Sequence, residues 1–165
     1  MKKLKIIFSF FVLLTSILLS CEEEENLKID VFNTKSDVRN LVVVISDLHL
    51  GADLSYAEIN LNLDPLRSFL EQIRISRSVK ELVLNGDIID EWFIPATVNP
   101  YNGNDQSHFI DRVANSNSNV VTKIRQIIQE GKILVTYIPG NHDLTITSDN
   151  VNRLFPGINQ SRDAD

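Results

Sequence analysis

Three short, mostly apolar runs, each followed within three residues by Asp or Asn, constrain the fold of this chain more than any other feature. They cover residues 41–45, 81–84 and 132–138. The first run is rich in Val and Ile, which is typical of a strand buried on both faces. Two longer stretches with helical spacing separate the runs. Because strands and helices alternate in this order, the sequence predicts an α/β fold with a parallel sheet and right-handed crossover helices.

The two stretches between the predicted strands have the apolar spacing of amphipathic helices. Asp64 and Pro65 would start the first helix, at its N-cap and its first helical position, and the helix would end near Arg77. The second stretch covers residues 109–128 and is followed by a glycine stop. The polar residues 115–119 could divide it into two helices. Each stretch would cross over the sheet between successive strands.

The first 20 residues resemble the signal peptide of a bacterial lipoprotein. Three Lys precede the apolar run 6–19, which is too short to span a bilayer. Ser20 and Cys21 follow this run as in a lipobox, so Cys21 would carry the lipid and become the mature N-terminus. The alternative is an uncleaved anchor helix. In either case we expect a membrane-anchored protein outside the cytoplasm, in the periplasm or at the cell surface.

An acidic tether is expected between this anchor and the folded domain. Residues 22–25 are four consecutive Glu, which repel one another and remain extended in solvent. They are either a plain linker or an export signal for display on the cell surface. We therefore divide the chain into a signal peptide (1–20), a tether (21–39) and a domain (40–165) that is incomplete at its C-terminus.

The charge of the chain disfavours one class of function, and its cysteine content excludes one kind of cross-link. Without the three Lys of the signal peptide, 13 basic side chains face 22 acidic ones. This excess of negative charge disfavours a protein that coats nucleic acid, because such proteins neutralise phosphates with Lys and Arg. The single cysteine also excludes an intramolecular disulfide.

Candidate metal ligands follow each of the three predicted strands. They are Asp47-x-His49, Gly86-Asp87 and the tetrapeptide 140–143, which reads Gly-Asn-His-Asp. The carboxyl ends of parallel strands meet at one edge of a sheet, where ligands bind. Asp47 and His49 would point to the same side of an extended segment and could hold one ion. Taken singly, each motif is also compatible with an ordinary turn, so their convergence carries the argument.

In this order, and with Asp90 three residues after Asp87, the motifs resemble those of the calcineurin-like metallophosphoesterase superfamily over residues 40–144. The resemblance implies the N-terminal half of an αββα sandwich. It also implies a metal-dependent hydrolase of phosphate mono- or diesters that uses two divalent metal ions. Mixed Asp, His and Asn ligands favour Mn, Fe or Zn. The expected partners are a phosphoester substrate and, through the N-terminal lipid, a membrane.

The resemblance also implies a role for each motif residue. The first ion would be bound by Asp47, His49 and Asp87, and the second by Asp87, which bridges the two ions, and Asn141. His142 would be a catalytic residue that protonates the leaving oxygen, and Asp90 would pair with it. His108 is expected to be a surface residue of a helix and not a ligand.

Two departures from the family pattern bear on activity. The family completes both metal sites with later histidines, whereas this sequence has none after His142. We therefore expect a truncated copy whose 165-residue form is inactive by itself; the alternative is a non-catalytic remnant or binding lipoprotein. The second departure is Glu91, which stands where protein phosphatases of the superfamily carry a phosphate-binding Arg. That branch is disfavoured.

The segment after the bridging acid bears on substrate choice. Asp90-Glu91-Trp92 resembles a narrower group, the UDP-2,3-diacylglucosamine pyrophosphatase-like enzymes. Trp92 and Phe93 could form an apolar lip for a lipid or nucleoside part of a substrate. Equally, Trp92 could simply seal the loop onto the sheet. We expect residues 92–105 to form a mobile loop at the mouth of the site.

Overall fold

A parallel sheet of four strands, in the order β1-β2-β3-β4, forms the centre of the fold. The strands are β1 (Leu41–Ile45), β2 (Val79–Asn85), β3 (Leu134–Ile138) and β4 (Asn159–Gln160). The computed structural model describes residues 31–32, 38–92 and 99–162. The predicted signal peptide, Cys21, most of the tether and Phe93 lie outside the described residues. Within the described part, the predicted α/β class and the parallel direction of the first three strands are confirmed.

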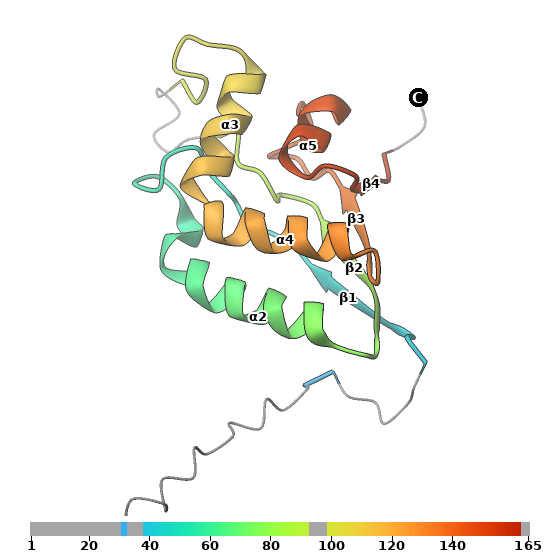
Figure 1. Cartoon of the computed structure of the whole chain (residues 1–165). Helices are drawn as coiled ribbons and strands as arrows, with labels where there is room; N and C mark the ends of the chain where they lie inside the picture. Colours follow the sequence, from blue (N-terminus) through green and yellow to red (C-terminus); the bar gives the residue numbers. More distant parts are fainter. Residues whose placement is uncertain (1–30, 33–37, 93–98, 163–165) are drawn as a thin grey trace, which may run out of the picture.

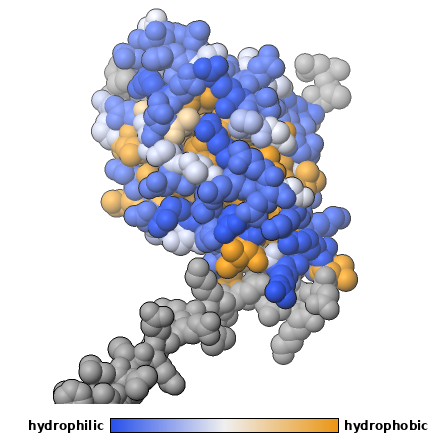
Figure 2. Space-filling view, viewed as in Figure 1, coloured by the Kyte–Doolittle hydropathy of each residue, from blue (hydrophilic) through white to orange (hydrophobic). Residues whose placement is uncertain are grey.

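Helices connect the strands and lie over one face of the sheet (Figure 1). They are the 3-10 helix η1 (Glu58–Asn62) and the α-helices α2 (Leu63–Ile75), α3 (Gln106–Ser116), α4 (Ser118–Glu130) and α5 (Ser148–Leu154). Helices α2 and α4 pack against each other on the same face of the sheet. Helices α3 and α5 pack against each other near the carboxyl ends of the strands. Figure 2 shows this side of the molecule, where hydrophilic side chains predominate.

The boundaries of the helices differ in detail from those expected. The N-cap of α2 is Asn62, because the 3-10 helix runs directly into it, so Asp64 and Pro65 lie inside its first turn. Proline is tolerated there, since the first turn has no intrahelical partner for its missing N–H. The predicted division of the second stretch is confirmed at Asn117, which separates α3 from α4. The predicted stop is Gly131, which has a φ of 63°.

The two faces of the sheet differ in their exposure to solvent. Leu82, Leu84 and Tyr137 face the helices and are fully buried. On the opposite face of β1, Val42 and Val44 are 53% and 57% exposed. The expectation that residues 41–45 are buried on both faces is therefore wrong for the described part of the chain, where no element covers the second face. The run of β-branched residues shows that both faces of this strand are apolar, but it does not show whether another element covers each face.

No pattern in the sequence indicates the last two elements, α5 and β4. The helix has seven residues and the strand has two, so neither is long enough to show a clear apolar period.

The described helices include none that is both long and apolar enough to cross a bilayer.

Candidate functional site

Three loops at the carboxyl ends of β1, β2 and β3 lie side by side and are joined by backbone hydrogen bonds. The N–H of Asp47 donates to the carbonyl of Gly86 at 3.1 Å, and that of His49 donates to the carbonyl of Asp87 at 2.9 Å. The N–H of Glu91 reaches the carbonyl of His142 at 3.3 Å. The loops therefore continue the parallel pairing beyond the strands, as expected for motifs that gather at one edge of a sheet.

Three of the predicted metal ligands have a strained backbone. Asp47, His49 and Asp87 have φ values of 55°, 48° and 52°, in the left-handed region that residues with a Cβ atom rarely adopt. Among the described residues, Asn102 is the only other non-glycine residue with a positive φ. Strain of this kind clusters at functional sites, where the surrounding structure holds it in place.

The predicted ligands of the first metal ion lie together. Asp47, His49 and Asp87 each offer one ligand atom, and these atoms lie within 4.8 Å of one another. Two carboxylate oxygens and one imidazole nitrogen form a donor set that suits a divalent transition metal. By the chemistry of its donors, the cluster therefore fits the first ion that the sequence implied.

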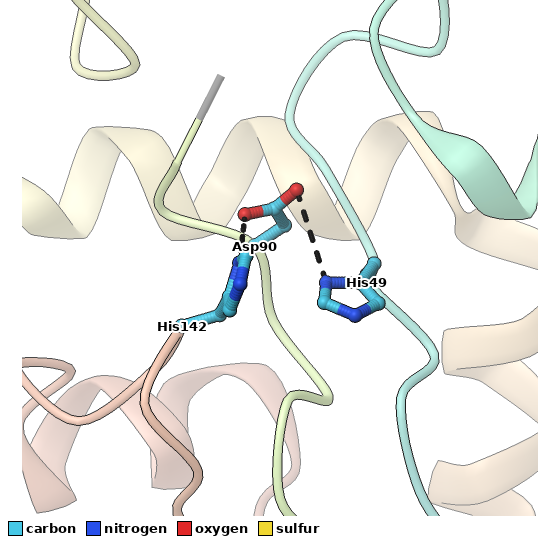
Figure 3. Close-up of side chains that lie close together, drawn as sticks. All are labelled: His49, Asp90 and His142. Atoms are coloured by element: carbon cyan, nitrogen blue, oxygen red, sulfur yellow. Dashed lines mark hydrogen bonds and ion pairs between the residues drawn. The ribbon is translucent and has the colours of Figure 1, made fainter. Parts of the chain in front are cut away.

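Asp90 lies between two histidines, as Figure 3 shows. Its Oδ1 is 3.0 Å from Nδ1 of His142, which is the predicted pairing. Its Oδ2 is 4.0 Å from Nδ1 of His49, a contact that the sequence did not suggest. The rings of His49 and His142 meet edge to face, with centroids 4.6 Å apart. Asp90, His49 and His142 form a second group whose ligand atoms lie within 4.8 Å of one another.

The turn that carries Asn141 and His142 is pressed against Asp87. The N–H of His142 donates to Oδ1 of Asp87 at 2.9 Å. A Cβ atom on Gly140 would lie 2.2 Å from that oxygen and 2.4 Å from the backbone nitrogen of Asp87. Only glycine allows so close an approach. Asn141, the predicted ligand of the second ion, is exposed in the same turn.

Glu91 points away from this cluster, although it follows Asp90 directly in the chain. Its buried carboxylate accepts hydrogen bonds from the hydroxyls of Tyr101 and Thr145 and, at 3.0 Å, from Nε2 of Gln106. Burial raises the pKa of the Tyr101 hydroxyl, and the bond to Glu91 raises it further. Glu91 thus ties the segment before α3 to the turn after β3.

Trp92 lies over His142. Its ring centroid is 4.4 Å from that of His142, at an interplanar angle of 36°, and its side chain is 56% exposed. At the far end of the 92–105 segment, Tyr101 packs on Phe109 with ring centroids 5.3 Å apart. Residues 93–98, including Phe93, lie outside the described residues, so the predicted mobility of this loop stays a prediction. His108 is exposed on α3, as expected.

Sequence reasoning missed one buried acid in the site. Asp143 is fully buried, and its carboxylate accepts hydrogen bonds from the N–H groups of Ile88, Ile89 and Gly140. Its place as the last residue of the tetrapeptide 140–143 was the only signal in the sequence. This side chain joins the second loop to the third.

Comparison with protein families identifies one match. Residues 41–164 match the family described as calcineurin-like phosphoesterase, and this range includes every described residue of the site. A comparison with curated proteins finds no significant match.

Proposed function

Because the chain belongs to the calcineurin-like phosphoesterase family, we propose that it derives from a metal-dependent hydrolase of phosphate mono- or diesters that uses two divalent ions. The observation that carries the proposal is the convergence of Asp47, His49 and Asp87 at one sheet edge. His142 lies beside them, with Asp90 at its Nδ1. A parallel sheet with helices on one face agrees with half of the family's sandwich.

The donor atoms identify which residues would hold the ions. We assign the first ion to Asp47, His49 and Asp87, and the second to Asp87 and Asn141. Nitrogen and oxygen donors together favour Mn, Fe or Zn over Mg or Ca, which prefer oxygen alone. When bound, two divalent ions supply Lewis-acid activation of the phosphoryl group and of the attacking water.

The proposed acid is His142. Its Nδ1 lies 3.0 Å from Oδ1 of Asp90, and when both ring nitrogens carry a proton, Nε2 can give its proton to the leaving oxygen of the substrate. Asp90 is itself fixed, because its Oδ1 accepts a hydrogen bond from the N–H of Trp92 at 2.8 Å. The carboxylate therefore holds the imidazole ring in one orientation, as a paired acid does in other acid–base sites.

Trp92 supports a proposal about the substrate. Its side chain is 56% exposed while its ring lies against His142, so one side of the indole remains open beside the proposed acid. We expect this surface to contact an apolar or aromatic part of the substrate, such as a lipid or a nucleoside. A tryptophan that only sealed the loop onto the sheet would be more deeply buried.

The donor count limits what the 165-residue chain can do. The second ion would depend on Asp87 and Asn141 alone, and two-metal catalysis requires both positions to be fixed. We therefore expect this chain to retain one ion and to hydrolyse phosphate esters negligibly. A form of the protein with further histidines would be active. The rival proposal, a non-catalytic remnant or binding lipoprotein, predicts no hydrolysis by either form.

Metal binding and hydrolysis can be measured on the same samples. Purified chain is titrated with Mn²⁺ or Zn²⁺ and assayed with p-nitrophenyl phosphate and bis-p-nitrophenyl phosphate, beside any longer form from the same reading frame. We expect one ion per chain, and its loss in the Asp87→Ala variant. The absence of metal binding by the unaltered chain would refute the proposal. Metal-dependent hydrolysis by the 165-residue chain that Asp87→Ala abolishes would refute the donor-count argument.

The membrane anchor is a separate proposal, and it rests on the sequence alone. Cys21 would carry the lipid that holds the domain to a membrane outside the cytoplasm. A Cys21→Ser variant should no longer be found in the membrane fraction, and its N-terminal peptide should lack the mass of the acyl chains. A Ser20→Ala variant keeps a small residue before the cysteine and should remain lipidated. If Cys21→Ser leaves both the membrane fraction and the N-terminal mass unchanged, the protein is not a lipoprotein.

A further inference from the structure

Beyond the residues that the proposed chemistry uses, we propose that Asp143 is a positioning residue for the site. Its carboxylate holds the loop that carries Asp87 and Asp90 against the turn that carries His142. This inference rests on the proposed function, because Asp87 is a metal ligand only within it. Asp143 itself contacts neither the ligand atoms of the cluster nor, on this proposal, the substrate.

The backbone of these two loops donates three hydrogen bonds to Asp143, and the buried hydroxyl of Tyr137 in β3 lies close enough for the carboxylate to raise its pKa. Oδ2 accepts from the N–H of Ile88 at 3.0 Å and from that of Ile89 at 3.2 Å. Oδ1 accepts from the N–H of Gly140 at 2.6 Å. Hydrogen bonds to an ionised acceptor are shorter and stronger than bonds between neutral groups. One side chain therefore fixes three backbone amides in two loops.

These amides are next to the functional residues. Ile88 and Ile89 fill the interval between Asp87 and Asp90, so their orientation determines where both carboxylates point. A return link runs from the N–H of His142 to Oδ1 of Asp87 at 2.9 Å. The two loops are therefore joined in both directions. The amides of the first loop donate to Asp143 in the second, and the amide of His142 in the second loop donates to Asp87 in the first. A shift of either loop would separate Asp87 from the proposed acid.

The chemistry of the contacts requires a carboxylate. An asparagine has one acceptor oxygen, so its NH₂ group would face either the amides of Ile88 and Ile89 or that of Gly140. In the described part of the chain, three backbone N–H groups donate to Asp143 and the Tyr137 hydroxyl lies beside it, with no Lys or Arg among the donors. Burying an acid without a paired cation is costly. Its presence here is therefore better explained by the position that it imposes than by stability alone.

The test compares two buried carboxylates with different surroundings. Asp143→Asn removes the link between the loops, whereas Glu91→Gln alters a buried acid whose partners are the side chains of Tyr101, Gln106 and Thr145. Both variants should lower the stability of the fold. Mn²⁺ affinity, measured from the electron paramagnetic resonance of the free ion, should fall 10- to 100-fold for Asp143→Asn, as is typical when a partner of metal ligands is changed. For Glu91→Gln it should change less than twofold.

Hydrogen exchange of the metal-free, unaltered chain provides a second measurement that needs no variant. The amides of Ile88 and Ile89 should exchange as slowly as that of Leu84 in β2, although they lie in a loop. Rapid exchange at both would refute the positioning role, even if Asp143→Asn does not fold. Unchanged Mn²⁺ affinity in Asp143→Asn, or an equal loss in Glu91→Gln, would also refute it. If the unaltered chain binds no Mn²⁺, the proposed metal site fails instead, and slow exchange would still support the link between the loops.

Discussion

Because the backbone of His49 is strained, we expect glycine and alanine at this position to rank in stability opposite to their usual order. His49 has a φ of 48° at a position where the proposed site needs an imidazole. We expect the His49→Gly variant to be more stable than the His49→Ala variant. Both changes remove the ring and its contacts with Asp90 and His142, so their difference depends on the backbone alone.

The magnitude follows from two opposing terms. A residue with a Cβ atom loses about 1–2 kcal/mol in the left-handed region, and glycine avoids this cost. Glycine loses about 0.4–1 kcal/mol relative to alanine, because its unfolded chain has more conformational freedom. The free energy of unfolding of His49→Gly should therefore exceed that of His49→Ala by about 0.5–1 kcal/mol. For a chain of this size, that corresponds to roughly 1–4 °C in melting temperature.

The assay is urea unfolding followed by circular dichroism, with EDTA present so that bound metal does not contribute. The control is Gln126, an exposed residue in the middle of α4. There the Ala variant should be more stable than the Gly variant by about 1 kcal/mol, as in ordinary helices. If His49→Ala is as stable as His49→Gly, or more stable, the backbone at this position stores no strain and the reasoning is wrong.

Three further predictions concern other parts of the structure. Gly140→Ala should weaken Mn²⁺ binding more than tenfold in a titration of the folded chain, because the added Cβ would lie 2.2 Å from an oxygen of Asp87. Glu71→Gln should lower the free energy of unfolding at pH 7 by roughly 1 kcal/mol, measured by urea unfolding across pH. The hydrogen bond from Arg74 holds the pKa of Glu71 at about 2, below its ordinary value of 4.5, so this contribution is present above pH 4.5 and is lost as the pH falls toward 2. Asp105→Ala should destabilise the fold by about 1 kcal/mol in thermal unfolding, because its side chain accepts the 2.8 Å N-cap hydrogen bond of α3.

The sequence alone determined that the first three strands are parallel and that their loops meet at one edge of the sheet. Alternation of strands and helices leaves a parallel sheet with right-handed crossovers as the favoured topology. In such a sheet, the residues after each strand lie at one edge, so the sequence pattern is sufficient to assign Asp47, Asp87 and His142 to one site. This inference needs only local patterns, because the chain direction of each strand fixes where its carboxyl end lies.

Only the tertiary structure decided how the side chains of those loops are directed. Asp90 and Glu91 are adjacent acids, yet Asp90 lies between two histidines and Glu91 accepts a hydrogen bond from Thr145, which is 54 positions away. The role of Asp143 likewise depends on amides 54 and 55 positions away. Neither the left-handed φ of His49 nor the open face of β1 could be read from residue type. These features depend on hydrogen bonds and packing between segments that are distant in the chain, and local propensity does not encode such contacts.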